Sequence, residues 1–406
     1  MTGTIRPLRV AFDARDLTAA APRGMVRYLL GLAQHLPAHG VSVTFFHRAR
    51  EPLNPVHLRG LDCRVIGLRD LGGLTWEQVA VPAALAGGGF DLYHAPAERG
   101  VPLVAPCPVV FTYHSATGDS YRDLVHRGQL PGPASRYLGY DPDLGRWGWR
   151  RAYSRAQLRR ADHLLAPSAF AGGELVQFLR VPLARVTVTP LGISEEFSRS
   201  RDSVATAAVL ARHGIRLPYL LFVGGYEPHK NVTGLLETFA AVRQTRPDLA
   251  LVAVGTKGVP AEVVEAATAR GLAPGREIHF LADLGDELVH LYDGAAVFVS
   301  MSWRETFGMP ALEAMARGVP VVASRWGAGP EVVGDAGELV DPRDPAAAAA
   351  AVLRILDPAI GGQLAARAAS RTRLFTYERT AAQTRVVYDR MLDQRAAHSG
   401  RTHADE

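Results

Sequence analysis

Cysteine and lysine are both scarce in this chain of 406 residues. The two cysteines, Cys63 and Cys107, are too few for a disulfide framework or for a metal site made of cysteines alone. The two lysines are Lys230 and Lys257, so nearly all of the 45 basic residues are arginines. Basic residues exceed the 40 acidic ones only slightly, and the formal net charge is +5 at pH 7. In so arginine-rich a chain, the retained Lys230 is a candidate functional residue.

Long hydrophobic runs are missing as well. No apolar run approaches the roughly 18 to 20 residues that a membrane span requires. The N-terminal segment MTGTIRPLRVAF does not follow the pattern of a signal peptide, because Arg6 and Arg9 directly adjoin an expected strand. We therefore expect a cytoplasmic protein.

Basic runs interleaved with aromatic residues, which nucleic-acid-binding proteins use, are not found in this sequence, so we expect no nucleic-acid partner. The strongly basic exception is residues 146–160, RWGWRRAYSRAQLRR, which have a helical pattern. Such a helix could contact anionic lipid headgroups and hold the protein peripherally at the inner face of a membrane. We favour the alternative of a solvated helix face, since acidic residues follow soon after.

Short apolar runs alternate with amphipathic stretches along the whole chain, which predicts parallel sheets with helices on both faces. The expected strands are 8–12, 41–46, 63–66, 92–94, 109–113, 163–166, 219–223, 249–254, 278–280, 297–300 and 319–323. The expected helices include 25–36, 157–161, 172–179, 233–245, 261–270 and 312–316. A chain of 406 residues should form two domains of roughly 200 residues. We predict α/β, doubly wound domains at 1–200 and 201–376, with a further helix at 377–392.

The most informative segment is 298–320, FVSMSWRETFGMPALEAMARGVP, which sets Glu305 and Glu313 eight positions apart around a turn. Pro310 is typical of the first position of a helix, so the amides of residues 307–309 should project from a helix N-terminus, where anions bind. Gly308 would let a ligand approach the backbone closely. Carboxylates before the turn and in the first helical turn would accept hydrogen bonds from sugar and ribose hydroxyls. For each glutamate taken singly we favour a structural role, whereas the joint pattern, with the glycine turn and Pro310 between them, favours a binding site.

Four further segments end strands or begin helices at positions where ligands of doubly wound sheets bind. The segment FVGGYEPHKN, 222–231, places His229 and Lys230 after a buried strand. Gly24 stands before an amphipathic helix, where its backbone could approach a phosphate. His94 and His114 each end an expected strand, and for His94 we favour the interpretation of a hydrogen-bonded histidine at the rim of the sheet.

These segments together resemble the retaining, nucleotide-sugar-dependent glycosyltransferases of family 4 (glycosyl transferases group 1), whose signature is two glutamates separated by seven residues. The resemblance covers nearly the whole chain. It implies a GT-B fold, in which two Rossmann-like domains face each other across a cleft, one binding the acceptor and the other the donor. In this family the last helix returns to the N-terminal domain, which we expect for residues 377–392.

The resemblance also implies roles for individual residues. The expected catalytic residues are His114, Glu305 and Lys230, and the expected donor-binding residues are Gly24, His229, Phe307, Gly308, Met309 and Glu313. Glu305 would hold hydroxyls of the donor sugar, Glu313 the ribose diol, and His114 would approach the sugar. The sequence departs from the family at His229 and Gly225, where many relatives carry arginine. It also departs after Gly24, where Met25 and Val26 replace Ile-Gly.

We expect neither a metal nor a cofactor, with the nucleoside-diphosphate sugar acting as substrate. The Asp-x-Asp at Asp141 and Asp143 lies among turn-forming residues, whereas the metal-binding Asp-x-Asp of other glycosyltransferases ends a buried strand. We therefore predict a turn there. Catalysis would then consist of orienting the reactants and stabilising the leaving diphosphate, with attack on the same face of the sugar.

Three other functions remain open. A sugar-nucleotide epimerase of the same architecture would need acid–base carboxylates in the N-terminal domain, for which no clear motif is present. A phosphorolytic transferase would need a pyridoxal-phosphate lysine, and the chain offers only Lys230 and Lys257. A non-catalytic sugar-nucleotide binding protein would bind the donor without turnover. For an enzyme, the Glu-Pro-His-Lys-Asn segment resembles relatives that use GDP-mannose or a related hexose, and the acceptor would be a glycan, glycolipid or small-molecule hydroxyl.

Overall fold

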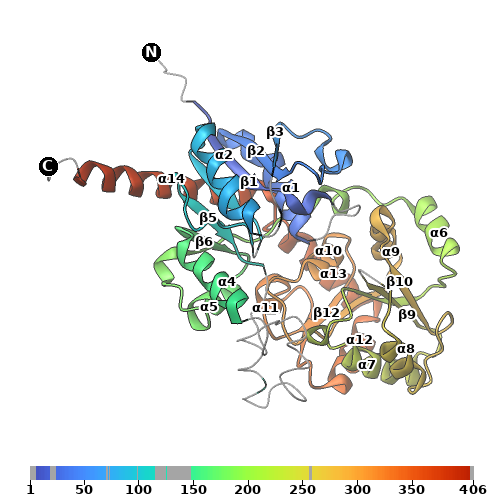
Figure 1. The fold of residues 1–406 in the computed structure, drawn as a ribbon. Coiled ribbons are helices and arrows are strands. Elements are labelled where there is room, and N and C mark those ends of the chain that lie inside the picture. The colour runs from blue at the N-terminus through green and yellow to red at the C-terminus, as the bar shows by residue number, and fades with distance from the viewer. Residues whose placement is uncertain are drawn as a thin grey trace. The chain divides into compact units, whose positions relative to one another are not determined.

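The computed structural model describes residues 6–18, 24–69, 72, 74–97, 99–114, 125, 148–255 and 258–402. The chain forms two compact units (Figure 1). The first holds the described residues in 6–114 and 148–192 together with those from Thr376 onward. The second is built from Ile193–Phe375.

The first unit is built on a seven-stranded parallel sheet in the order β3-β2-β1-β4-β5-β6-β7. Its strands are β1 (Leu8–Asp13), β2 (Val41–Arg48), β3 (Cys63–Leu68), β4 (Leu92–Ala95), β5 (Val109–Thr112), β6 (His163–Ala166) and β7 (Val186–Val188). Its helices are α1 (Gly24–His35), α2 (Val81–Gly88), α4 (Gly148–Arg160), α5 (Ala169–Gln177) and α14 (Tyr377–Thr402).

The second unit is built on a six-stranded parallel sheet in the order β10-β9-β8-β11-β12-β13. Its strands are β8 (Tyr219–Val223), β9 (Ala250–Gly255), β10 (Ile278–Ala282), β11 (Val297–Ser300), β12 (Val321–Ser324) and β13 (Glu338–Val340). Its helices are α6 (Ser203–Arg212), α7 (Val232–Thr245), α8 (Ala261–Thr268), α9 (Leu288–Gly294), α10 (Met309–Ala316), α11 (Gly329–Val332), α12 (Pro345–Ile355) and α13 (Pro358–Thr372).

Strand order reverses in each unit between the first strand and the fourth, which is the order of a Rossmann fold. The prediction of doubly wound, parallel α/β units is therefore confirmed. In such sheets, ligands bind beyond the carboxyl ends of the strands at this switch point. The switch point lies between β1 and β4 in the first unit and between β8 and β11 in the second.

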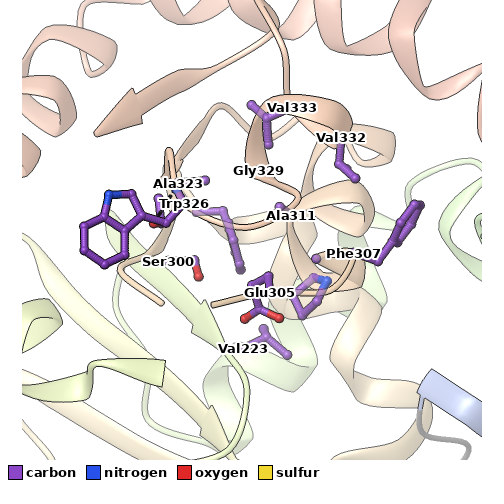
Figure 2. A pocket seen from close by; sticks show the side chains of 14 residues that line it. Val223, Ser300, Glu305, Phe307, Ala311, Ala323, Trp326, Gly329, Val332 and Val333 are labelled. Atoms are coloured by element: carbon purple, nitrogen blue, oxygen red, sulfur yellow. Dashed lines mark hydrogen bonds between the residues drawn. The ribbon is translucent and has the colours of Figure 1, made fainter. Parts of the chain in front are cut away.

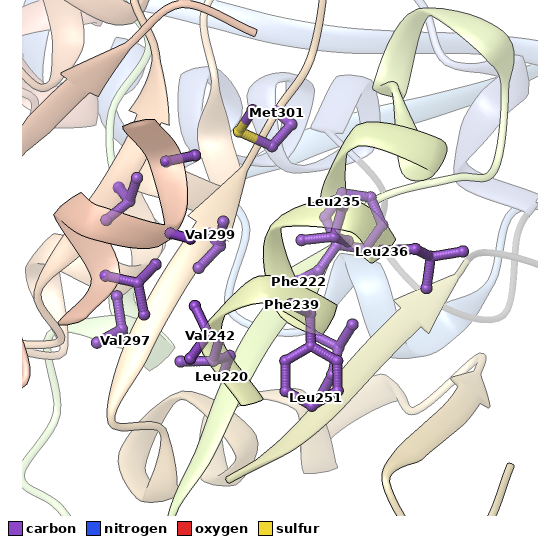
Figure 3. Close-up of a cluster of buried hydrophobic side chains, with 14 of the residues drawn as sticks. Leu220, Phe222, Leu235, Leu236, Phe239, Val242, Leu251, Val297, Val299 and Met301 are labelled. Carbon is purple, nitrogen blue, oxygen red and sulfur yellow. The ribbon is translucent and has the colours of Figure 1, made fainter. Parts of the chain in front are cut away.

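Each face of the second sheet has its own core, because successive side chains of a strand point to opposite faces. Leu220 and Phe222 of β8 pack with α7 and α12 in one cluster, part of which is drawn in Figure 3. Tyr219 and Leu221 of the same strand belong to a second cluster with residues of α6, α9 and α10. β8 is thus apolar at almost every position, as expected for a strand covered on both faces.

Tyr377, the first residue of α14, is held by two glycines of the first unit. A Cβ atom added at Gly31 would lie 2.3 Å from the ring of Tyr377, so α1 can pack this closely against α14 only with glycine there. A Cβ atom at Gly192 would lie 2.1 Å from the backbone nitrogen of Tyr377. Three residues further on, the hydroxyl of Thr380 donates to the carbonyl of Pro190 at 2.7 Å.

The sequence missed two strands and placed some helix ends wrongly. The strands β7 and β13 have only three residues each, too few for an apolar run to stand out. The last helix was predicted to end at 392 but continues to Thr402. The expected helix 157–161 is the end of a longer helix, α4 (Gly148–Arg160), which matches the helical pattern noted for residues 146–160.

Candidate functional site

Two loops meet at the switch point of the second sheet. One follows β8 and contains His229 and Lys230, and the other follows β11 and contains Glu305. The backbone N–H of Trp303 donates to the carbonyl oxygen of His229 at 2.8 Å, which joins the loops. Asn231 fixes the end of the first loop in a left-handed conformation (φ 51°) and caps α7 by accepting from the N–H of Gly234.

The carboxylate of Glu305 is the centre of this site. Its Oε1 accepts hydrogen bonds from Nζ of Lys230 and from the hydroxyl of Ser302, each at 2.8 Å. The side chains of Glu305 and Lys230 are 23% and 17% exposed, so the ion pair is reachable by a ligand but partly shielded from water. Burial by itself would raise the pKa of Glu305, but the charge of Lys230 and the two hydrogen bonds hold this pKa below its usual value. Glu305 is therefore ionised at neutral pH.

The loop after β12 holds the backbone of Glu305 from the other side. The N–H of Ala328 donates to the carbonyl oxygen of Glu305 at 2.9 Å. Gly327 has a positive φ of 70°, and a Cβ atom there would lie 2.5 Å from the same carbonyl oxygen. This close backbone approach requires glycine at 327. The segment Trp-Gly-Ala-Gly, residues 326–329, therefore fixes the position of the Glu305 backbone.

A pocket of about 410 Å³, including its open side, lies beside Glu305 (Figure 2). It is lined by Val223, Phe298, Ser300, Glu305, Phe307, Gly308, Pro310, Ala311, Ala323, Ser324, Trp326, Gly329, Val332 and Val333. Gly308 has a φ of 98°, and nothing lies within 4 Å of where its Cβ would be. The space in front of this turn can thus admit a ligand next to the backbone.

The helix after the turn begins at Met309, with Gly308 as its N-cap residue. Pro310 is therefore the second helical residue, one position later than the sequence indicated. Phe307 is 4% exposed and packs its ring against Phe375 with centroids 5.7 Å apart, so it contributes its backbone rather than its side chain to the turn. Oriented amides at a helix N-terminus carry partial positive charge, which suits a diphosphate.

Glu313 does not lie in the first turn of α10, contrary to the expectation from sequence, because the helix has no acidic residue in that turn. It is the fifth helical residue and is only 1% exposed. Its Oε2 accepts a hydrogen bond from the hydroxyl of Tyr292 at 2.7 Å. Glu313 is also absent from the pocket lining. Its binding to a ribose diol stays a prediction.

His229 and Gly225, the two positions where many relatives carry arginine, each have a distinct local environment. Burial and the adjacent charge of Lys230 lower the pKa of His229 to about 4, against the opposing carboxylates of Glu305 and Glu227. His229 is thus neutral at pH 7 and leaves Lys230 as the cation of the pair. A Cβ atom at Gly225 would lie 1.9 Å from Oε2 of Glu227, so the carboxylate of Glu227 occupies the space that a side chain at 225 would need.

Gly24 and His114, the remaining predicted site residues, belong to the first unit. Gly24 is the first residue of α1 and is exposed, with nothing within 4 Å of where its Cβ would be. His114 follows β5 and is half-buried, and its ring packs edge-on against Tyr28 with centroids 4.8 Å apart. His94 is fully buried and bonded through both ring nitrogens, so it is a core histidine rather than a rim residue. The roles of Gly24 and His114 stay predictions.

Buried histidines of the first unit should make its stability fall in acid. Burial, reinforced by the charge of His114, lowers the pKa of His94 to about 3, and burial lowers that of His163 to about 4. Between pH 6.5 and 4, unfolded imidazoles bind protons that the folded ones do not, so stability is full above pH 6.5 and is lost as the pH falls. In this window each histidine should lower the free energy of unfolding by about 1.4 kcal/mol for every unit by which the pH falls. Chemical denaturation at several pH values measures this slope, and His163→Gln should make it shallower; a stability that stays constant down to pH 4 would contradict the assignment.

A metal site is not found in the part of the chain that the structure describes, where no group of three or more His, Cys, Asp or Glu side chains could hold an ion. Asp141 and Asp143 lie outside the described residues. Within the described ranges, no helix combines the length and apolar character needed to cross a membrane. The contact of residues 146–160 with lipid stays a prediction.

Sequence reasoning missed Ser302 and Tyr292, the hydroxyl donors to Glu305 and Glu313. Ser302 lies three positions before Glu305, but serine in a loop is too common to be a signal. Tyr292 is 21 positions from Glu313 on another helix, and only the packing of α9 against α10 through the core brings them together.

Two family descriptions match this chain. "Glycosyltransferase Family 4" matches residues 22–197, and "Glycosyl transferases group 1" matches residues 217–358. A D-inositol 3-phosphate glycosyltransferase of Salinispora tropica is 32% identical, over 90% of this chain and 80% of its own length. An O-antigen chain mannosyltransferase B of Escherichia coli is 34% identical, over 57% of this chain and 61% of its own length.

Among solved structures, a sucrose-phosphate synthase of Thermosynechococcus elongatus is similar in fold. It aligns with a TM-score of 0.72 and 23% identity, over 96% of this chain and all of that one (100%). Together with the two Rossmann-like sheets, this likeness confirms the predicted GT-B fold class.

Proposed function

This chain belongs to glycosyltransferase family 4 and is a glycosyltransferase, and we propose that it moves a sugar from a nucleoside-diphosphate donor to an acceptor hydroxyl with retention of the anomeric configuration. The observation that supports this proposal most directly is the ion pair between Lys230 and Glu305 at the switch point of the second sheet. It stands beside a turn whose backbone is open to a ligand at Gly308.

The proposed donor lies with its diphosphate at the turn of residues 307–309. The turn amides and Lys230 then share the negative charge that develops on the leaving diphosphate, which is stabilisation of the transition state rather than of the bound substrate. Glu305 is ionised and already oriented by Lys230 and Ser302, so it can accept hydrogen bonds from donor-sugar hydroxyls without reorganising. His114 of the first unit would contact the sugar.

Retention follows in this proposal from attack by the acceptor on the same face of the sugar that the diphosphate leaves. A double displacement would need a carboxylate nucleophile. The proposal instead assigns Glu305, held by Lys230 and Ser302, to the hydroxyls of the donor sugar. The residues therefore act by orienting the reactants and stabilising charge.

We propose GDP-mannose or a related hexose donor, with a glycan, glycolipid or small-molecule hydroxyl as acceptor. The name of the Escherichia coli relative, a mannosyltransferase, supports the mannosyl donor. The name of the Salinispora relative supports an inositol phosphate as a small-molecule acceptor to be tried first.

A panel of sugar nucleotides tests the proposal. UDP-, GDP-, dTDP- and ADP-sugars are each incubated with the protein, with and without inositol phosphates and oligosaccharides, and both sugar release and transfer are measured. We expect turnover with one nucleotide family, and a transferred sugar whose anomeric proton coupling matches that of the donor. Binding without turnover would favour a non-catalytic sugar-nucleotide protein, and a new sugar nucleotide as product would favour an epimerase.

We expect transfer to continue in the presence of excess EDTA. The charge of the leaving diphosphate is taken up by Lys230 and the amides of residues 307–309, so a divalent ion is not required. The measurement is the initial rate before and after dialysis against EDTA. A rate that collapses and is restored by Mg²⁺ or Mn²⁺ would show that a metal carries this charge instead.

A further inference from the structure

A chain of buried hydrogen bonds runs through the first unit from the C-terminal helix to α1. The hydroxyl of Tyr388 on α14 lies 2.6 Å from Nδ1 of His94 on β4. The Nε2 atom of His94 lies 2.7 Å from the hydroxyl of Thr112 on β5. This hydroxyl lies 2.9 Å from that of Tyr28 on α1. The four side chains are between 0% and 1% exposed, so water does not compete for these bonds.

Tyr28, the last residue of this series of hydrogen bonds, contacts His114. The rings of Tyr28 and His114 pack edge-on, with centroids 4.8 Å apart and an interplanar angle of 69°. An edge-on contact fixes the tilt of one ring relative to the other. The orientation of Tyr28 is in turn fixed by its bond to Thr112. A continuous series of contacts thus links the His114 ring to a hydroxyl of α14.

Burial lowers the pKa of His94 to about 3, so its imidazole is neutral at pH 7. A neutral imidazole has one donor and one acceptor nitrogen, and the hydroxyls of Tyr388, Thr112 and Tyr28 can each donate once and accept. Either tautomer of the neutral ring pairs both nitrogens, provided that the hydroxyls of Tyr388 and Thr112 take the matching donor and acceptor roles. Removing one hydroxyl leaves a nitrogen or oxygen without a partner in a site closed to water, which allows the neighbouring rings to move.

We propose that Tyr388 and His94 are positioning residues for His114, acting through the hydrogen-bonded chain Tyr388–His94–Thr112–Tyr28. The effect on catalysis rests on the proposed function, in which His114 contacts the donor sugar. The effect on the position of the His114 ring does not rest on the proposed function. Because Tyr388 lies on α14, the proposal gives the C-terminal helix a part in the active site in addition to packing. Tyr388 lies 294 positions after His94 in the sequence.

Tyr388→Phe tests the proposal, because it keeps the ring and removes only the hydroxyl. The ring resonances of His114 are followed by NMR in protein labelled at histidine, assigned with His114→Gln, and kcat and KM for donor and acceptor are measured in parallel. We expect the His114 resonances to shift and kcat to fall about 10- to 100-fold, while the KM for the donor changes less than twofold. Thr112→Val, which breaks the series of hydrogen bonds in its middle, should shift the His114 resonances and lower kcat in the same way. Thr112→Ser keeps the hydroxyl and should restore wild-type values.

Tyr219→Phe is the matched control. Tyr219 is also fully buried, and its hydroxyl donates to the carbonyl of Leu291 at 2.6 Å in the second unit. This variant loses a comparable buried bond but should leave the His114 resonances and kcat unchanged. His114 resonances that stay in place in both Tyr388→Phe and Thr112→Val would overturn the proposal. If the wild-type protein transfers no sugar, the proposed function fails, whereas the NMR result still decides whether the chain of bonds positions His114.

Discussion

Replacing Lys230 by methionine is expected to lower kcat/KM for glycosyl transfer by about 1,000-fold. Methionine keeps the length of the side chain but removes the ammonium group that would stabilise the leaving diphosphate. It also removes the donor that holds Oε1 of Glu305 at 2.8 Å. Because the charge develops as the sugar–phosphate bond breaks, most of the loss should appear in kcat and a smaller part in KM. Steady-state kinetics with the donor found in the panel measure both.

Arg246→Met is the control for the loss of one positive charge from the same unit. Arg246 forms an exposed pair with Asp248, with N and O atoms 2.7 Å apart, and pairs of this kind contribute little. Its kinetics should match those of the wild-type protein. Thermal melting of Lys230→Met shows whether the unit is still folded. A folded Lys230→Met protein that keeps activity within tenfold of wild type would refute the assignment of Lys230.

Gly192→Ala is expected to destabilise the first unit by about 3 kcal/mol, which corresponds to a fall in melting temperature of roughly 10 °C. The added Cβ would lie 2.1 Å from the nitrogen of Tyr377 and 2.6 Å from the carbonyl carbon of Thr376. These are backbone atoms, so no side-chain rotation can make room, and the start of α14 must move. Chemical denaturation measures the free energy of unfolding.

The same substitution at Gly173 is the matched control. Gly173 is exposed within α5, and nothing lies within 4 Å of where its Cβ would be. Alanine there should stabilise the unit by about 1 kcal/mol, because glycine is a poor helix former. The two glycine substitutions are therefore expected to have opposite signs. If Gly192→Ala is as stable as wild type, then the packing described here for the start of α14 is wrong.

The sequence predicted the strands and the loop positions of the second unit well. The apolar runs at 219–223 and 297–300 are strands with the bounds that were expected. Pro310 predicted the start of α10 to within one residue, because the constraint it imposes is local. The positions of Lys230 and Glu305 after strands predicted that both lie at one edge of a sheet, where the structure joins them in an ion pair.

Contacts between distant segments could not be predicted in this way. The bond between Tyr292 and Glu313 depends on how α9 and α10 cover the sheet, and no local pattern marks either residue. The carboxylate of Glu227 fills the space beside Gly225, and this contact depends on the path of the loop. The burial of His94 beneath α14 likewise arises from tertiary packing. Local patterns thus identified which residues stand at strand ends, and tertiary packing determined their partners.

Calorimetric titration with nucleoside diphosphates is the most direct measurement of the central claim, that the Lys230–Glu305 site binds the diphosphate of a donor. UDP, GDP, dTDP and ADP are titrated into wild type, Lys230→Met and the control Arg246→Met. The account predicts that one nucleoside diphosphate binds wild type and Arg246→Met equally and binds Lys230→Met at least tenfold more weakly. Equal binding by wild type and Lys230→Met, or no binding by any of the four, would contradict it.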